Sequence, residues 1–90
     1  MSKWKAHFTL GALKQLQGLD KEVRIRLVSK LEWTAEHFDS VSLETLKADF
    51  SGFYKLRVGD YRAVYDIDWK TSNIIVVEVG HRSKIYRKRR

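Results

Sequence analysis

The sequence predicts an α+β domain, a small and mainly antiparallel β-sheet with an N-terminal helical hairpin packed on one face, in the order β-α-α-β-β-β. Three observations predict it. Residues 52–65 alternate apolar and polar side chains around a Gly59-Asp60 pair, which is typical of a β-hairpin. Residues 20–38 repeat apolar side chains at helical spacing. Residues 74–79 are almost continuously apolar, which is typical of a central strand.

The N-terminal half predicts one strand and two helices. Residues 3–8 alternate polar and apolar side chains and predict the first strand. Thr9 is expected to cap a helix that ends near Gly18, a residue typical of the position after a helix, and Asp20 to cap a second, longer helix. The apolar positions of both helices are expected to face the sheet. They are Leu10, Ala12, Leu13, Leu16, Val23, Ile25, Leu27, Val28, Leu31, Thr34 and Phe38.

The C-terminal half predicts the rest of the sheet. Residues 39–51 are less regular and are expected to pack a loop or a short helical turn against the core. Strands are expected at about 53–58, 61–67 and 73–80, with a turn at 69–72 between the last two. Tryptophans 4, 33 and 69 are expected in the core or in turns.

Composition limits the kind of protein. The chain has 90 residues and no proline or linker, so we expect a single domain over 1–90. It has no cysteine, which excludes disulfides and thiolate metal sites, and no apolar run of the roughly 18 residues that a membrane span needs. His and carboxylate residues show no metal-ligand spacing. We therefore expect a cytoplasmic protein with no membrane partner and no metal or other cofactor.

The net charge of +7, from 18 basic and 11 acidic residues, is concentrated at one end. Residues 1–80 hold 12 basic and 11 acidic side chains, whereas the tail at 81–90 holds six basic and no acidic ones. A basic cluster beside a structured anion-binding face predicts nucleic acid as the partner. A tail that only improves solubility explains the charge run equally well.

The predicted hairpin places cations together. Glycine first in a two-residue loop at 59–60 is typical of a type II′ turn, which needs a positive φ there. With that loop, Arg57 lies opposite Arg62 and Lys55 opposite Val64, all on one face. Like charges directly opposite each other destabilise a sheet. Such a pair therefore predicts a site for an anion.

Several segments resemble the RelE/ParE toxin superfamily of bacterial type II toxin–antitoxin systems. They are Leu46-Lys47, the hairpin at 54–65, the Val79-Gly80-His81-Arg82 run and Tyr86-Arg87. The resemblance covers nearly the whole chain and implies a RelE-like fold. RelE-like members cut messenger RNA in the ribosomal A site, whereas ParE-like members share the fold and inhibit DNA gyrase. The RelE-like branch is favoured.

The resemblance also implies roles for single residues. Lys55 and Arg62 match basic residues at the scissile phosphate, Arg82 or Lys84 fills a further arginine position, and Tyr86 matches a C-terminal catalytic tyrosine. His81 is a further candidate, because some relatives use a histidine. The residues expected to contact RNA are Arg57, Lys84 and Arg87.

The implied activity is a ribosome-dependent endoribonuclease without a metal, which attacks the phosphate through the ribose 2′-OH and leaves a cyclic phosphate. The implied partners are the ribosome, messenger RNA and a cognate antitoxin. A ParE-like gyrase inhibitor and a non-catalytic RNA- or ribosome-binding module stay open. Each of three residues also has a purely structural interpretation. Tyr86 would be a packing residue, His81 a surface residue, and Glu78 the ion-pair partner of an arginine.

Overall fold

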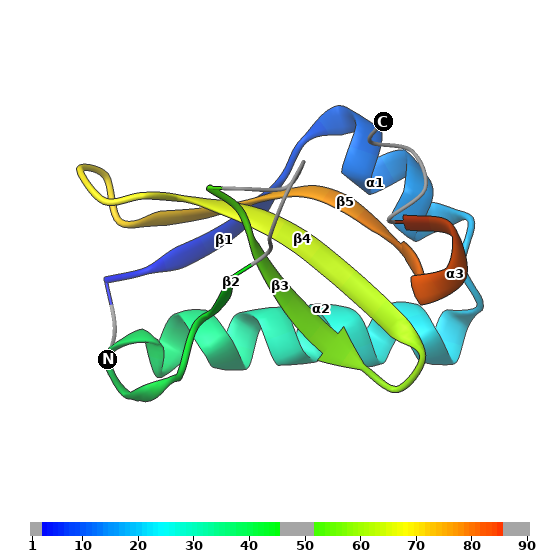
Figure 1. Cartoon of the computed structure of the whole chain (residues 1–90), viewed down its shortest axis with the longest axis horizontal. Coiled ribbons are helices and arrows are strands. Elements are labelled where there is room, and N and C mark those ends of the chain that lie inside the picture. The colour runs from blue at the N-terminus through cyan, green and yellow to red at the C-terminus, as the bar shows by residue number, and fades with distance from the viewer. Residues whose placement is uncertain (1–2, 46–51, 86–90) are drawn as a thin grey trace.

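The computed structural model describes residues 3–45 and 52–85 and confirms the α+β class (Figure 1). Its elements in chain order are β1 (Lys5–Phe8), α1 (Leu10–Gln17), α2 (Lys21–Glu36), the 3-10 helix η1 (Phe38–Ser40), β2 (Glu44–Thr45), β3 (Tyr54–Val58), β4 (Tyr61–Asp68), β5 (Asn73–His81) and α3 (Arg82–Ile85). The predicted strands are present with ends shifted by one or two residues. Two short elements, β2 and α3, were not predicted, and η1 is the helical turn expected after α2.

One sheet of five strands has the order β1-β5-β4-β3-β2. β3, β4 and β5 form an antiparallel meander, β2 joins β3 antiparallel, and β1 lies parallel to β5. The sheet is therefore mainly antiparallel, as predicted. Both long helices pack on one face, and Figure 1 shows α2 crossing behind β3. The opposite face is the one on which the hairpin carries its cations.

The helix starts follow the sequence only in part. Thr9 caps α1 as predicted, since its Oγ1 accepts a hydrogen bond from the Ala12 N–H at 3.1 Å. Gly18 ends α1 with φ −83°, so the left-handed conformation that favours glycine after a helix is not used. Asp20 occupies the N-cap position of α2, as predicted, and its carbonyl oxygen accepts the Arg24 N–H at 2.9 Å, but its side chain makes no capping hydrogen bond.

The core lies between the two helices and the sheet. Its buried apolar members are Trp4, Ala12, Leu16, Leu27, Leu31, Ala35, Phe38, Leu56, Val58, Ala63, Tyr65, Ile67, Ile74, Val76 and Val79. The prediction was wrong for Leu10, Leu13 and Ile25, which are exposed. Ile25 precedes the buried Leu27 by two residues, which places it about 200° around a helix of 3.6 residues per turn.

Within the described residues, no helix is both long and apolar enough to cross a membrane.

The three tryptophans differ in burial. Trp4 is buried and stacks on Phe38 with a centroid distance of 3.9 Å, and Trp69 in the β4–β5 turn packs edge-on against both rings. Trp33 on α2 is 52% exposed, so it belongs neither to the core nor to a turn.

Candidate nucleic-acid interface

The β3–β4 hairpin has the predicted register. Arg57 lies opposite Arg62 and Lys55 opposite Val64. Gly59 has φ +60°, and Asp60 does not have a positive φ, as a type II′ turn requires. Because the turn fixes the register, the side chains of Lys55, Arg57 and Arg62 share the sheet face opposite the helices. We call this surface the basic face.

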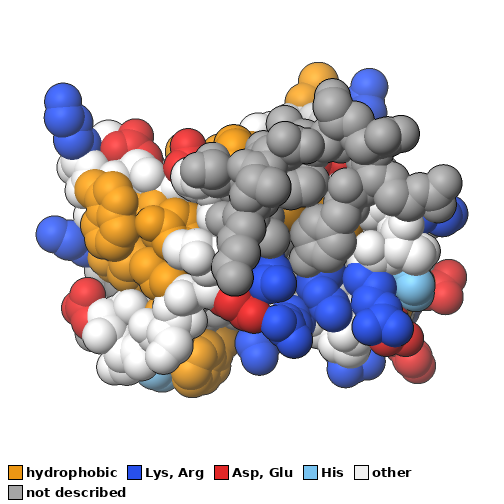
Figure 2. Space-filling model, in the orientation of Figure 1, with side chains coloured by type: hydrophobic (Ala, Val, Ile, Leu, Met, Phe, Trp, Pro, Cys, Tyr) orange, Lys and Arg blue, Asp and Glu red, His pale blue; other side chains and the backbone are white. Residues whose placement is uncertain are grey.

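Strand pairing extends the basic face into two rows. One row runs from Glu44 through Lys55 and Val64 to Glu78, and the other from Arg57 through Arg62 to Gly80. Figure 2 shows lysine and arginine side chains gathered over this hairpin. The basic face is not open to solvent throughout, because Arg62, Val64 and Glu78 are buried.

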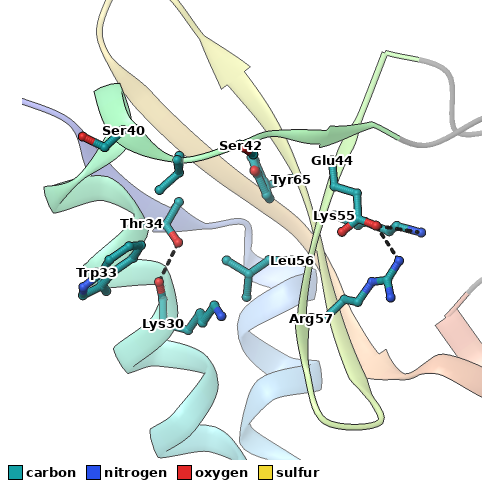
Figure 3. Close-up of a pocket in the computed structure, with 11 residues that line it drawn as sticks. Lys30, Trp33, Thr34, Ser40, Ser42, Glu44, Lys55, Leu56, Arg57 and Tyr65 are labelled. Atoms are coloured by element: carbon teal, nitrogen blue, oxygen red, sulfur yellow. Dashed lines mark hydrogen bonds and ion pairs between the residues drawn. The ribbon is translucent and has the colours of Figure 1, made fainter.

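The sequence reasoning missed Glu44, which joins two cations of the basic face. Its Oε2 pairs with Arg57 Nη2 and lies 3.8 Å from Lys55 Nζ (Figure 3). Glu44 is brought there by β2, a strand of two residues that pairs with Lys55 and Tyr54. One carboxylate of the chain itself therefore neutralises part of the charge of the basic face.

Arg62 has a second kind of partner. Its Nη1 donates hydrogen bonds to the carbonyl oxygens of Gly59, at 2.8 Å, and Tyr61, at 3.0 Å. The side chain is 9% exposed and holds the turn from within the hairpin. The like-charge pair is thus relieved by Glu44 on one arginine and by turn carbonyls on the other, so the folded chain does not need an external anion for this purpose.

The remaining candidates of the described chain lie around α3. The Arg82 N–H donates to the Asp60 carbonyl oxygen at 2.9 Å, which places exposed Arg82 beside the hairpin turn. Lys84 lines a hollow against α1 together with His81. His81 lies opposite Tyr61 in the sheet and contacts its ring edge-on, which places it on the face opposite Lys55 and Arg62. The structure therefore places the Arg82 backbone beside the turn of the hairpin and separates His81 from the basic face.

His81 is also engaged locally. Its Nδ1 lies 2.8 Å from Ser83 Oγ and accepts the Ser83 N–H at 3.2 Å.

Tyr86, Arg87 and the Leu46-Lys47 pair lie outside the described residues. Among the residues that the structure does describe, no three His, Cys, Asp or Glu side chains form a group that could hold a metal ion.

Tyr65 lines the hollow in Figure 3 together with Lys55, Arg57 and Glu44. Burial, with smaller contributions from Tyr54 and Glu44, raises the pKa of Tyr65 to about 12. A phenol with so high a pKa stays protonated at neutral pH, so Tyr65 cannot serve as a general base there.

Glu44→Gln should strengthen binding of single-stranded RNA several-fold. The substitution keeps the shape of the side chain and removes the charge that now faces Arg57 and Lys55. If one more cation then meets phosphate, the slope of log affinity against log salt should steepen by about 0.7. Fluorescence anisotropy across a salt series measures both quantities.

Glu32→Gln is the matched control, because it makes the same charge change at an exposed position of α2. Equal strengthening in both variants would mean that only net charge matters and that the pairing of Glu44 with the basic face does not.

Comparisons with solved structures define the class. The alignment with isolated E. coli RelE toxin has 27% identity and a TM-score of 0.73, and it covers 94% of this chain and 93% of that one. The intact E. coli RelBE toxin–antitoxin complex gives 26% identity and a TM-score of 0.67 over 87% and 95%. The RelBE2 complex of Mycobacterium tuberculosis gives a TM-score of 0.79 over 93% and 97%, and at 23% identity it shows the fold alone. The fold is that of RelE-like toxins.

The family model described as "ParE toxin of type II toxin-antitoxin system, parDE" matches residues 6–86. The chain therefore belongs to this toxin family within the RelE/ParE superfamily, and several RelE structures among its neighbours support the RelE-like branch. No curated protein sequence is significantly similar to it.

Proposed function

We propose that this toxin is a ribosome-dependent endoribonuclease that cuts messenger RNA in the A site without a metal ion. The observation that carries the proposal is the hairpin register, which holds Lys55, Arg57 and Arg62 on one face, with Arg82 beside their turn. The similarity to E. coli RelE, at 27% identity, supports it. The domain spans the whole of 1–90, and the protein acts in the cytoplasm.

RNA cleavage of this kind needs three catalytic contributions. The ribose 2′-OH must lose a proton, the pentavalent phosphorane must be stabilised, and the 5′ leaving oxygen must gain a proton. In this proposal Lys55, Arg62 and Arg82 supply positive charge where negative charge grows on the phosphate. Arginine suits that role because it stays charged and can donate two parallel hydrogen bonds.

Tyr86 is proposed as the general base or as the group that orients the 2′-OH. Cations around a tyrosine lower its pKa from about 10, which makes such a role possible near neutral pH. Lysine, arginine and tyrosine are weak acid–base catalysts without such help. We therefore propose that the free protein is a poor nuclease and that the ribosome positions its RNA. His81 stays a candidate of lower rank, because it lies on the other face of the sheet.

A cognate antitoxin completes the proposal. Several structural neighbours are toxin–antitoxin complexes, among them RelBE of E. coli and RelB-RelE of Methanococcus jannaschii. Such a partner would neutralise the basic face. Arg57 on that face, together with Lys84 and Arg87, is expected to contact RNA.

The second candidate is a non-catalytic inhibitor of DNA gyrase, favoured by the ParE description of the matching family model. Induced expression followed by primer extension on a reporter message separates the two. We expect growth arrest with cuts at codon positions, and no cuts in the double variant Arg62→Ala/Tyr86→Ala. Intact messages with an SOS response would contradict the nuclease and support the gyrase inhibitor. Salt-sensitive RNA binding without cleavage would support a binding module.

A further inference from the structure

α3 is too short to be stable by itself. Its four residues, Arg82–Ile85, make a single helical turn. The first turn of a helix costs more conformational entropy than its hydrogen bonds return, so an isolated turn does not persist in water. α3 therefore depends on the rest of the fold, and it contacts β5 and β4 (Figure 1). Because α3 begins with Arg82, the contacts that hold this turn also determine where the backbone of that arginine stands.

α3 is anchored at both of its ends, and one anchor is the side chain of His81. At the far end Ile85 is buried. At the start the Arg82 N–H donates to the Asp60 carbonyl oxygen of the hairpin turn at 2.9 Å. The next N–H, that of Ser83, donates to His81 Nδ1 at 3.2 Å. A side-chain acceptor on the residue before a helix, bonded to the second helical N–H, has the geometry of an N-cap.

This cap specifies the protonation state of His81. A backbone N–H can only donate, so Nδ1 carries a lone pair and the ring proton is on Nε2. The Ser83 hydroxyl, whose Oγ lies 2.8 Å from Nδ1, then donates to the same atom. In an imidazolium both ring nitrogens are donors, so Nδ1 no longer accepts the Ser83 N–H. Only the neutral imidazole caps α3.

The imidazole is held in place by Tyr61 of the neighbouring strand. His81 and Tyr61 are cross-strand partners, and their rings meet edge-on at a centroid distance of 5.3 Å. This contact lies on the face of the sheet opposite Lys55 and Arg62. His81 is therefore not placed to touch a phosphate on the basic face, and its influence on such a phosphate passes through α3.

Other titratable groups share the surroundings of His81. Asp60 lies in the adjoining hairpin turn, and further groups line the same hollow as His81 from α1, the start of α2, β4, β5 and α3. They are Lys14, Asp20, Tyr61, Glu78 and Lys84. Because charges of both signs surround the ring, an effect of pH on α3 is assigned to His81 only by comparing variants at each pH.

We infer that His81 is a positioning residue, whose neutral imidazole caps α3 and so holds the Arg82 backbone beside the hairpin turn. This inference rests on the proposed function, since it requires a reaction in which Arg82 takes part. It replaces a direct acid–base role for His81 with a role that any good N-cap acceptor fills. It also makes the placement of Arg82 sensitive to acid, because the cap is lost when the imidazole takes up a proton.

Single-turnover cleavage of a programmed ribosome tests the positioning role. His81→Ala removes the cap and should lower the rate by about 5- to 30-fold, the factor that corresponds to the usual contribution of an N-cap. Most of that loss should appear in the rate, because a single turn has little stability to spare. His81→Asn should cleave within about threefold of the wild type, because asparagine is a good N-cap residue. His7→Ala is the control, since His7 is exposed on β1, contacts Asn73 and lies far along the chain from α3.

The pH profile adds a readout that a purely structural role would not change. From about pH 8 to about pH 6 the rate of the wild type, divided by that of His81→Asn, should fall, because histidine takes up its proton toward the lower value and asparagine does not. The rate of His7→Ala should follow the wild type at each pH. Because every ratio is taken at one pH, titration of the neighbouring groups and of the ribosome cancels.

Hydrogen exchange of the Ser83 N–H, followed by NMR on the free protein, reports the cap without the ribosome. Exchange should be slow in the wild type and in His81→Asn, and several-fold faster in His81→Ala. Thermal melts monitored by circular dichroism establish that each variant is folded.

The outcomes are distinguishable. If His81→Asn loses as much activity as His81→Ala, the side chain acts through its acid–base chemistry and the inference is wrong. If His81→Ala cleaves within about twofold of the wild type, the positioning role is overturned and the nuclease proposal stands. If the wild type does not cleave, the nuclease proposal fails and the positioning role falls with it, while exchange of the Ser83 N–H still shows whether His81 caps α3.

Discussion

Replacing Arg62 by lysine is expected to lower the rate of message cleavage on the ribosome by about 100-fold or more, the usual cost of losing one well-aimed donor. Arg62 Nη1 is already engaged by the carbonyl oxygens of Gly59 and Tyr61. In the proposed mechanism its other nitrogens, Nη2 and Nε, donate to the phosphate while Nη1 holds the turn. A lysine has one nitrogen at the end of a flexible stem and cannot serve both partners.

Single-turnover cleavage of a programmed ribosome measures this effect. Arg57→Lys is the control, because Arg57 is exposed, is paired with Glu44 and has no proposed role at the scissile phosphate. It should change the rate only a few-fold. Arg62→Lys needs an accompanying melting curve, since Arg62 also stabilises the turn. A folded Arg62→Lys variant that cleaves within threefold of the wild type would remove Arg62 from the active site.

The hairpin was predictable because local geometry determines it. A two-residue loop with glycine first fixes the pairing of every residue after it, so the opposition of Arg57 and Arg62 follows from the sequence. Short elements were not predictable in the same way. β2 has two residues and exists because β3 offers an edge to pair with, which no local pattern records. Helical periodicity likewise gave the buried stripe of α2 but widened it wrongly to Ile25.

The same distinction between local geometry and tertiary pairing applies to the candidate site. Side-chain alternation placed Lys55 and Arg62 together, and the structure agrees. Alternation carried across to β5 would also have shown that His81, opposite Tyr61, faces away from them. The contact of Glu44 with Arg57 could not be predicted from the sequence, because it depends on a tertiary pairing between segments 13 residues apart. The exposure of Trp33 depends on which side of α2 meets the sheet.

Tyr65 should make the stability of the fold depend on pH in the alkaline range. It is 2% exposed, and its pKa in the folded chain is about 12, against about 10 for an unperturbed tyrosine. Between these values the unfolded chain loses the phenolic proton and the folded chain keeps it. The unfolded state then binds fewer protons, so the free energy of unfolding falls as pH rises. The contribution is complete below pH 10 and is lost toward pH 12, by about 2 to 3 kcal/mol.

Urea unfolding at pH 8, 10 and 11.5 tests this, with the wild type compared to Tyr65→Phe and Tyr61→Phe. Lysines also titrate in this range, so the informative quantity is the difference between wild type and variant at each pH. Tyr65→Phe should remove most of the alkaline loss, whereas Tyr61→Phe, on the same face but less buried, should retain it. Equal alkaline losses in all three proteins would mean that Tyr65 ionises freely in the folded state. The argument from its pKa that excludes Tyr65 as a general base would then fail.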